Sequence, residues 1–128
     1  NSISMDEQEF RLSVQDKNKS IKELIKNNKK FINKFNNFIV TMGKNGCYHV
    51  AKNLILYSPT VYSTFKDTTG SGDVFFSIYI ALKITKKFTD KEICLICHIA
   101  AGLHANNIGN DKIFDLSTLY KAIDLVLK

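Results

Sequence analysis

The stretch "KDTTGSGDVF", residues 66–75, places two glycines between two aspartates and then runs directly into an apolar segment. Gly70 and Gly72 allow backbone conformations that other residues avoid, and they let a ligand approach the backbone amides closely. The first turn of the helix that follows leaves several N–H groups without partners, and its dipole favours negative charge. The stretch therefore predicts an anion site at the N-terminus of a helix.

Asp73 separates this stretch from a Walker loop, in which a Lys-Ser/Thr pair would follow the glycines. Where backbone amides hold a phosphate, a carboxylate can take the proton of a substrate hydroxyl while the amides stabilise charge on the transferred phosphoryl group. A purely structural reading stays open from these residues alone. An aspartate in a first turn favours the helix dipole by itself, and Gly-Ser-Gly is common in loops.

Length and composition favour one compact unit. A chain of 128 residues with 45% hydrophobic residues can bury one core and is too short for two ordinary domains. No apolar stretch is long enough to span a bilayer, and Asn1 opens neither a signal peptide nor a native start. We expect a cytoplasmic protein without a membrane partner, and we expect this chain to be a fragment of a longer one.

The net charge of +6 comes from seventeen lysines and a single arginine, Arg11. Many of the lysines lie among asparagines, as in "IKNNKKFINKFNN", residues 25–37. Nucleic-acid binding favours arginine forks with aromatic platforms nearby, whereas scattered lysines usually solvate a surface. We therefore expect no nucleic-acid partner, although a basic nucleic-acid binder remains an alternative reading.

Cys94, Cys97 and His98 spell C-x-x-C-H, the spacing of c-type haem attachment and of half a zinc site. The surrounding segment repeats its apolar residues at helical spacing, and no second cysteine pair completes a metal shell. We expect buried thiols packed in a helix, with no haem, zinc or disulfide.

The order of the elements indicates an α/β fold. The pattern predicts strands near residues 1–5, 37–42, 47–51, 54–59 and 60–65, with Gly43 and Gly46 in a hairpin turn. It predicts helices that begin near residue 6 and span about 19–28, 74–86, 90–107 and 116–127. Thr89 or Asp90 can cap the helix at 90–107, and Asp115 the last one.

Four segments resemble the ribokinase-like (PfkB) carbohydrate kinases. "DTTGSGD" resembles the family signature D-T-x-G-A-G-D, and "VTMGKNGCYHV", residues 40–50, resembles the strand, Thr-x-Gly-x-x-Gly turn and returning strand beside the nucleotide. "CHIAAGLHANNIG", residues 97–109, resembles the helix and turn over the adenine, and "SMDEQEFRL", residues 4–12, resembles the Asn-x-x-Glu segment. The resemblance implies a three-layer αβα fold with a mainly parallel sheet. Residues 1–128 would be the nucleotide-binding, carboxyl-terminal portion of one ribokinase-like domain.

The resemblance also assigns roles to residues by position. Asp73 matches the catalytic base, and Gly70, Ser71 and Gly72 match the anion hole. Five further positions match the nucleotide-binding residues: Thr41, Gly43, Gly46, His98 and Gly109.

Metal sites follow from the same comparison. Asp6 stands where the asparagine of Asn-x-x-Glu is expected and Glu9 is its acid, a pair that would organise Mg2+ and phosphate. Asp67 and Thr69 match residues that hold a monovalent cation, such as K+, in some members. The later part of that cation site, residues 110–114, lacks the expected serine.

The implied activity is transfer of the γ-phosphate of ATP to a hydroxyl of a sugar or sugar phosphate, with a homodimer as the implied assembly. The segments at residues 6–12 and 106–111 look most like the branch that includes heptose-phosphate kinases. Most sugar-binding residues of the family lie in an amino-terminal half that nothing here resembles, so the isolated chain is expected to be inactive. The alternative reading is a non-catalytic nucleotide-binding or scaffolding module.

Overall fold

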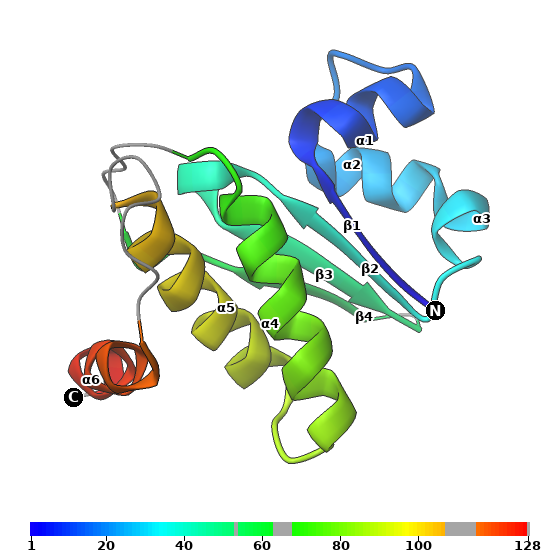
Figure 1. Ribbon diagram of the computed structural model, residues 1–128. Helices are drawn as coiled ribbons and strands as arrows, with labels where there is room; N and C mark the ends of the chain where they lie inside the picture. Colours follow the sequence, from blue (N-terminus) through cyan, green and yellow to red (C-terminus); the bar gives the residue numbers. More distant parts are fainter. Residues whose placement is uncertain (53, 63–67, 107–114, 128) are drawn as a thin grey trace.

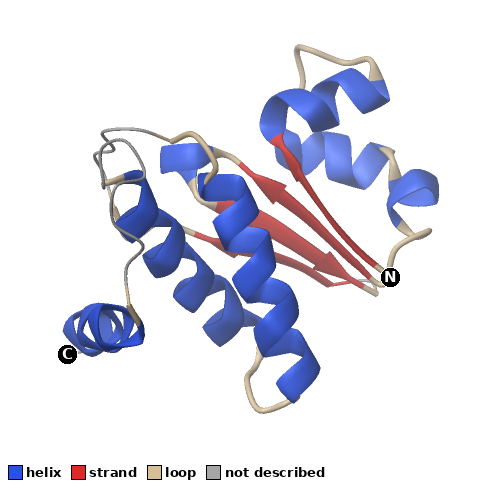
Figure 2. Ribbon diagram, in the orientation of Figure 1, coloured by secondary structure: helices blue, strands red, loops and turns tan. Residues whose placement is uncertain are grey.

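The computed structural model describes residues 1–52, 54–62, 68–106 and 115–127. A four-stranded sheet forms the middle layer (Figures 1 and 2), with helices α1–α3 on one face and helices α4 and α5 on the other. Helix α6 lies beyond α5, on the side away from the sheet (Figure 1). The α/β class and the three-layer arrangement predicted from the sequence are confirmed.

The strands are β1 (Ser2–Asp6), β2 (Asn37–Thr41), β3 (Cys47–Ala51) and β4 (Leu54–Ser58), hydrogen-bonded in the order β1-β2-β3-β4. Only β1 and β2 run parallel, with Asp6 opposite Thr41, while β2 with β3 and β3 with β4 are antiparallel. The described strands therefore form a mixed sheet in place of the expected mainly parallel one. Connection length explains the difference, because short turns return the chain antiparallel and only the helical crossover from β1 to β2 permits a parallel pair.

The helices lie close to their predicted spans. Their bounds are α1 (Glu7–Val14), α2 (Ile21–Asn27), α3 (Lys29–Ile32), α4 (Ser71–Thr85), α5 (Asp90–Ala105) and α6 (Leu116–Leu127). Capping boxes open three of them: α1 at Asp6, α2 at Ser20 and α5 at Thr89. Helix α4 begins at Ser71, three residues earlier than expected, so that Gly72 and Asp73 belong to its first turn.

Strand β2 explains how one short sheet carries two cores, because alternate side chains point to opposite faces. Phe38 and Val40 are fully buried against α1–α3, where Phe10 meets Phe38 edge to face at 5.2 Å. Ile39 is fully buried on the other face, in the cluster formed with α4 and α5. A continuous apolar run in β2 therefore reflects burial from both sides.

The three cysteines are free and buried, and all belong to the core between the sheet and the pair α4–α5. The sequence-based prediction of packed thiols is thus confirmed. In the part of the chain that the structure describes, no group of three or more His, Cys, Asp or Glu side chains could hold a metal ion.

Residues 60–65 do not contribute the predicted strand in their described part, since Thr60–Tyr62 belong to no strand and 63–65 lie outside the described residues. The ring of Tyr62 instead lies directly on Gly102 of α5, where an added Cβ would overlap the ring. A small residue at Gly102 therefore lets this connection pack against the helix.

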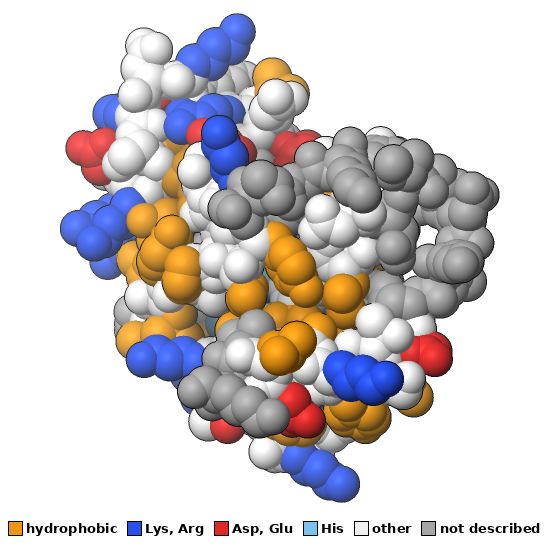
Figure 3. Space-filling model, turned by 90° about the vertical axis from the view of Figure 1, so that its left-hand side faces the viewer, with side chains coloured by type: hydrophobic (Ala, Val, Ile, Leu, Met, Phe, Trp, Pro, Cys, Tyr) orange, Lys and Arg blue, Asp and Glu red, His pale blue; other side chains and the backbone are white. Residues whose placement is uncertain are grey.

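Figure 3 shows one face of the surface, on which hydrophobic side chains gather near the centre and basic side chains are scattered. Several large apolar side chains are exposed, Leu116 and Ile84 among them. Among the described helices, none combines the length and the apolarity needed to cross a membrane.

The turn between β2 and β3 yields a prediction about its two glycines. Gly46 has φ +82° and its added Cβ would overlap the Ser58 carbonyl oxygen, whereas Gly43 has φ +52° with no atom within 4 Å of an added Cβ. Gly46→Ala should therefore lower the free energy of unfolding by about 3 kcal/mol, and Gly43→Ala by about 1 kcal/mol, the cost of left-handed backbone alone. Urea unfolding followed by circular dichroism measures both values, and equal losses would contradict the packing argument.

Candidate functional site

The glycine loop, residues 68–72, leads into α4 through a tight turn. The amide of Ser71 donates to the Thr68 carbonyl oxygen over 3.1 Å, and Gly70 between them has φ 75° and ψ −3°. The first bond of the helix runs from the Val74 amide to the Gly70 carbonyl oxygen at 3.0 Å. Within the described residues, the amides of Gly72 and Asp73 donate to no backbone acceptor of the loop. The helix therefore presents unpaired N–H groups at this end, as the sequence predicted.

The two glycines of the loop have different reasons to be glycine. Gly70 adopts a positive φ that other residues rarely take, so the turn itself requires it. Gly72 has no such φ, and an added Cβ would meet nothing within 4 Å. The expectation that both glycines serve an unusual backbone is thus wrong for Gly72, whose bare amide is required by neither conformation nor packing.

A groove of about 880 Å3 joins this loop to the ends of two strands. It is lined by Asp6 and Glu9 at the start of α1, by Thr41 and Gly43 at the end of β2, and by residues 70–73. These segments meet because β1 and β2 are parallel and therefore end at the same edge of the sheet. Asp73 is exposed in this groove, one position from the bare amide of Gly72.

Asp6 and Glu9 form a reciprocal capping box. The Glu9 amide donates to Asp6 Oδ1 and the Asp6 amide donates to Glu9 Oε2, each over 2.8 Å. This local role alone explains their spacing of three residues. Each carboxylate keeps a second oxygen toward which no hydrogen bond is directed from the described residues, so the pair can also offer oxygen ligands in the groove.

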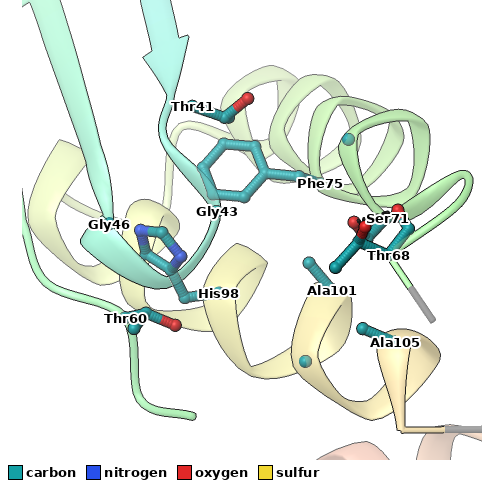
Figure 4. Close-up of a pocket in the computed structure, with 12 residues that line it drawn as sticks. Thr41, Gly43, Gly46, Thr60, Thr68, Ser71, Phe75, His98, Ala101 and Ala105 are labelled. Atoms are coloured by element: carbon teal, nitrogen blue, oxygen red, sulfur yellow. Dashed lines mark hydrogen bonds between the residues drawn. The ribbon is translucent and has the colours of Figure 1, made fainter. Parts of the chain in front are cut away.

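A smaller pocket of about 70 Å3 adjoins the groove, and Thr41, Gly43, Thr68, Ser71 and Gly72 line both. Four of the five predicted nucleotide-binding residues line this pocket: Thr41, Gly43, Gly46 and His98. In Figure 4 the Phe75 ring projects from α4 between Thr41 and His98. The glycine loop therefore separates an open carboxylate-lined groove from a narrow pocket.

His98 is buried in the wall of this pocket, with an exposed fraction of 6%. Its ring meets Phe75 edge to face at 5.1 Å, and its Nε2 has no hydrogen-bond partner among the described residues. Burial lowers the pKa of His98 to about 4, while a hydrogen bond with the Ser58 backbone opposes this shift. The imidazole is therefore neutral at pH 7 and offers a polar atom inside a mostly apolar pocket.

Sequence reasoning missed the rest of the pocket wall. This part of the wall consists of Phe75 on α4, three small residues on α5, Ala101, Gly102 and Ala105, and two threonines, Thr60 and Thr68. The small residues follow His98 by three, four and seven positions, which places all four on one face of a helix. The spacing is visible in the sequence, but only the packing of α5 against α4 shows that this face of α5 lines the pocket.

Of the remaining predicted residues, only Thr69 can be placed relative to these two hollows. Gly109 and Asp67 lie outside the described residues. Thr69 lines neither hollow, and its carbonyl oxygen lies 3.1 Å from Nε2 of His104.

The chain matches the sequence pattern of the family described as pfkB family carbohydrate kinase over residues 2–108. Ribokinase from Thermotoga maritima is similar in structure, with a TM-score of 0.81 and 22% identity, covering 96% of this chain and 42% of that protein. Arabidopsis thaliana ribokinase, solved with ribose and ATP, has a TM-score of 0.82 and 17% identity, covering 96% of this chain and 40% of that protein. Escherichia coli phosphofructokinase-2, solved with potassium, has a TM-score of 0.80 and 16% identity, covering 99% of this chain and 41% of that protein. These likenesses confirm the ribokinase-like αβα fold.

The chain spans about two fifths of the length of these solved structures. No curated protein sequence matches it.

The burial of His98 predicts a loss of stability in mild acid. Its pKa is about 4 in the folded chain, against about 6.5 when unfolded. Between these values the unfolded state binds a proton that the folded state does not, so stability falls as the pH falls through this window. From pH 7.5 to pH 5, His98 should account for about 2 kcal/mol of lost unfolding free energy.

Urea unfolding of the wild type and of His98→Asn at both pH values measures this contribution. The variant should lose about 2 kcal/mol less than the wild type over the same interval. A residual loss should remain, because burial also lowers the pKa of His49. If the two proteins showed the same pH dependence, His98 would not be a source of the lost stability.

Proposed function

The chain belongs to the pfkB family of carbohydrate kinases, and we propose that it is the part that binds the nucleotide and carries the catalytic base. In this proposal the chain is the carboxyl-terminal portion of a single ribokinase-like domain. The whole protein transfers the γ-phosphate of ATP to a hydroxyl of a sugar or sugar phosphate. The rest of that protein supplies most of the sugar-binding residues, so the chain on its own is inactive.

The observation that carries this proposal is the pairing of a bare amide with a carboxylate at the start of α4. Gly72 has an ordinary backbone conformation and free space above it, so its missing side chain serves no need of the fold. Asp73 follows it in the same groove. A phosphoryl group held on these amides would lie beside a carboxylate able to accept the proton of an attacking hydroxyl.

The chain's own residues divide the work in this mechanism. Residues 70–72 form the anion hole: the amides of Gly70 and Gly72, together with the dipole of α4, stabilise the negative charge that develops on the transferred phosphoryl group, while the Ser71 amide closes the turn. Asp73 holds the substrate hydroxyl by accepting its hydrogen bond and takes its proton as the new O–P bond forms and the bond from the γ-phosphorus to the bridging oxygen breaks, with ADP as the leaving group. The nucleotide is bound by the four predicted residues that line the pocket, Thr41, Gly43, Gly46 and His98. Gly109 is proposed to contribute as well.

Asp6 and Glu9 fit a magnesium ion through the carboxylate oxygens that the capping box leaves free, because Mg2+ prefers oxygen ligands and keeps several waters. The ion would neutralise charge on the phosphates of bound ATP. Asp67 and Thr69 are proposed to hold a monovalent cation. The heptose-phosphate branch is proposed for the substrate from the segments at 6–12 and 106–111.

A coupled assay of the full-length protein with ATP and a panel of sugars and sugar phosphates tests the function directly. ADP release that depends on one of these acceptors is the expected result. ATP binding without any acceptor-dependent turnover would favour the alternative of a non-catalytic nucleotide-binding module.

Replacement of Asp73 by Asn tests the base. Asn keeps the size of the side chain and can still hold a hydroxyl, but it cannot take a proton, so turnover should fall about 100- to 10,000-fold. Thermal unfolding and ADP affinity, measured by calorimetry, should stay close to the wild type because the side chain is exposed. A variant that keeps more than about a third of the wild-type rate would remove Asp73 from this role.

Gly72→Ala tests the anion hole, with Gly70→Ala as its matched control. The Gly72 variant should melt within a few degrees of the wild type and still bind ADP, yet turn over about 100- to 1,000-fold more slowly. The Gly70 variant should lose stability as well, because its φ of +75° is strained for alanine. Near-normal turnover of the Gly72 variant would place the anion hole elsewhere.

A further inference from the structure

A histidine of α5 holds the glycine loop from outside both hollows. His104 lies in the last turn of α5, and its Nε2 is 3.1 Å from the carbonyl oxygen of Thr69. The same nitrogen would lie 3.4 Å from a Cβ added at Gly70. His104 itself lines neither the groove nor the pocket.

The direction of this hydrogen bond follows from its acceptor. A carbonyl oxygen can only accept, so Nε2 of His104 must carry the proton and donate. Both the neutral Nε2–H form and the imidazolium can do so. The contact therefore persists whichever of these forms is present.

The bonded carbonyl belongs to the central peptide of a turn. Residues 68–71 form a β-turn closed by the bond from the Ser71 amide to the Thr68 carbonyl oxygen at 3.1 Å. Gly70 at its third position has φ 75° and ψ −3°, the values of a type II turn. The competing type I turn differs mainly by reversal of the Thr69–Gly70 peptide, and glycine accepts either sign of φ.

Reversal of that peptide would turn the Thr69 carbonyl oxygen away from His104 and break the bond. Because a trans peptide is planar, its C=O and N–H point in opposite directions, and the described chain holds no cis peptide. A Thr69 carbonyl fixed toward α5 therefore fixes the Gly70 N–H pointing away from His104. Gly70 lines the groove that also holds Asp73.

We propose that His104 is a positioning residue that selects the type II form of the glycine loop and so presents the Gly70 N–H to the phosphoryl group. The inference rests on the proposed function for its catalytic consequence. The structural part of the proposal, that His104 selects one of two orientations of the Thr69–Gly70 peptide, depends only on the hydrogen bond between His104 and Thr69. A glycine turn that can adopt both forms without strain gains from an external donor that stabilises one of them.

The test compares His104→Ala with His104→Gln in the full-length protein. Alanine removes the donor, whereas the side-chain amide of glutamine can replace the Nε2–H at similar reach. We expect His104→Ala to lower kcat about tenfold with the KM for ATP changed less than about twofold, since a misdirected donor affects the transition state most. His104→Gln should restore most of the rate.

Asn106→Ala is the matched control for simple fraying of the helix end. Asn106 caps the end of α5, where its Nδ2 donates to the Gly102 carbonyl oxygen over 2.9 Å, and among the described residues it makes no hydrogen bond to residues 68–71. This variant should leave kcat unchanged. Equal losses of kcat in the alanine variants of His104 and Asn106, or no rescue by glutamine, would reduce His104 to a structural residue and overturn the proposal.

A second readout does not need turnover. With 15N-labelled glycine, the amide resonance of Gly70 should move in His104→Ala and return toward the wild-type position in His104→Gln. An unchanged Gly70 resonance would overturn the proposal. If the wild type transfers no phosphate, the proposed function is wrong. A moved Gly70 resonance would then still show that His104 sets the conformation of the loop, but the catalytic role assigned to it would be overturned.

Discussion

The parallel pairing of β1 with β2 is the constraint on which the site depends. It places Asp6 opposite Thr41, so the capping acid of α1 and the turn after β2 open at the same edge of the sheet. Helix α4 begins at that edge with its glycine loop, and one groove includes all three segments. An antiparallel arrangement of these two strands would send the two strand ends to opposite edges, and the carboxylates would lie far from the amides.

Three glycines around this edge illustrate three separate physical demands. Gly46 is buried under the Ser58 and Pro59 backbone and combines crowding with a positive φ. Gly70 supplies only the positive φ of a type II turn. Gly72 has neither a positive φ nor a crowded neighbourhood, so the fold does not explain why it is glycine, and a bound ligand can. Glycine in a motif is therefore evidence for binding only where the fold does not already explain it.

The face of the sheet that carries the site also buries polar groups in its core. His49 is 1% exposed, and its Nε2 lies 3.0 Å from the Tyr79 hydroxyl and 3.3 Å from Asn37 Oδ1. Asp90 pairs with Lys83 beside it and approaches the other ring nitrogen at 3.9 Å. These contacts join β2 and β3 to both α4 and α5, and they fix the orientation of the helices that present the glycine loop and the pocket wall.

The sequence by itself determined the local events. Hydrophobic periodicity predicted the helices, the apolar run at residues 37–42 predicted β2, and Thr89 or Asp90 as a cap predicted the start of α5, because propensity and capping act over a few residues. It also predicted an anion site at residues 70–73, since unpaired amides belong to any helix start. Only the tertiary structure decided that the described sheet is mixed and that the turn into α4 requires a positive φ at Gly70 but not at Gly72. It also decided that Phe75 lines the pocket beside the glycine loop and that His104 donates a hydrogen bond to the loop. The hydrogen bond between His104 and Thr69 joins residues 35 positions apart, and His98 of α5 lines the same pocket as Thr41 of β2. No local pattern in the chain records such long-range neighbours.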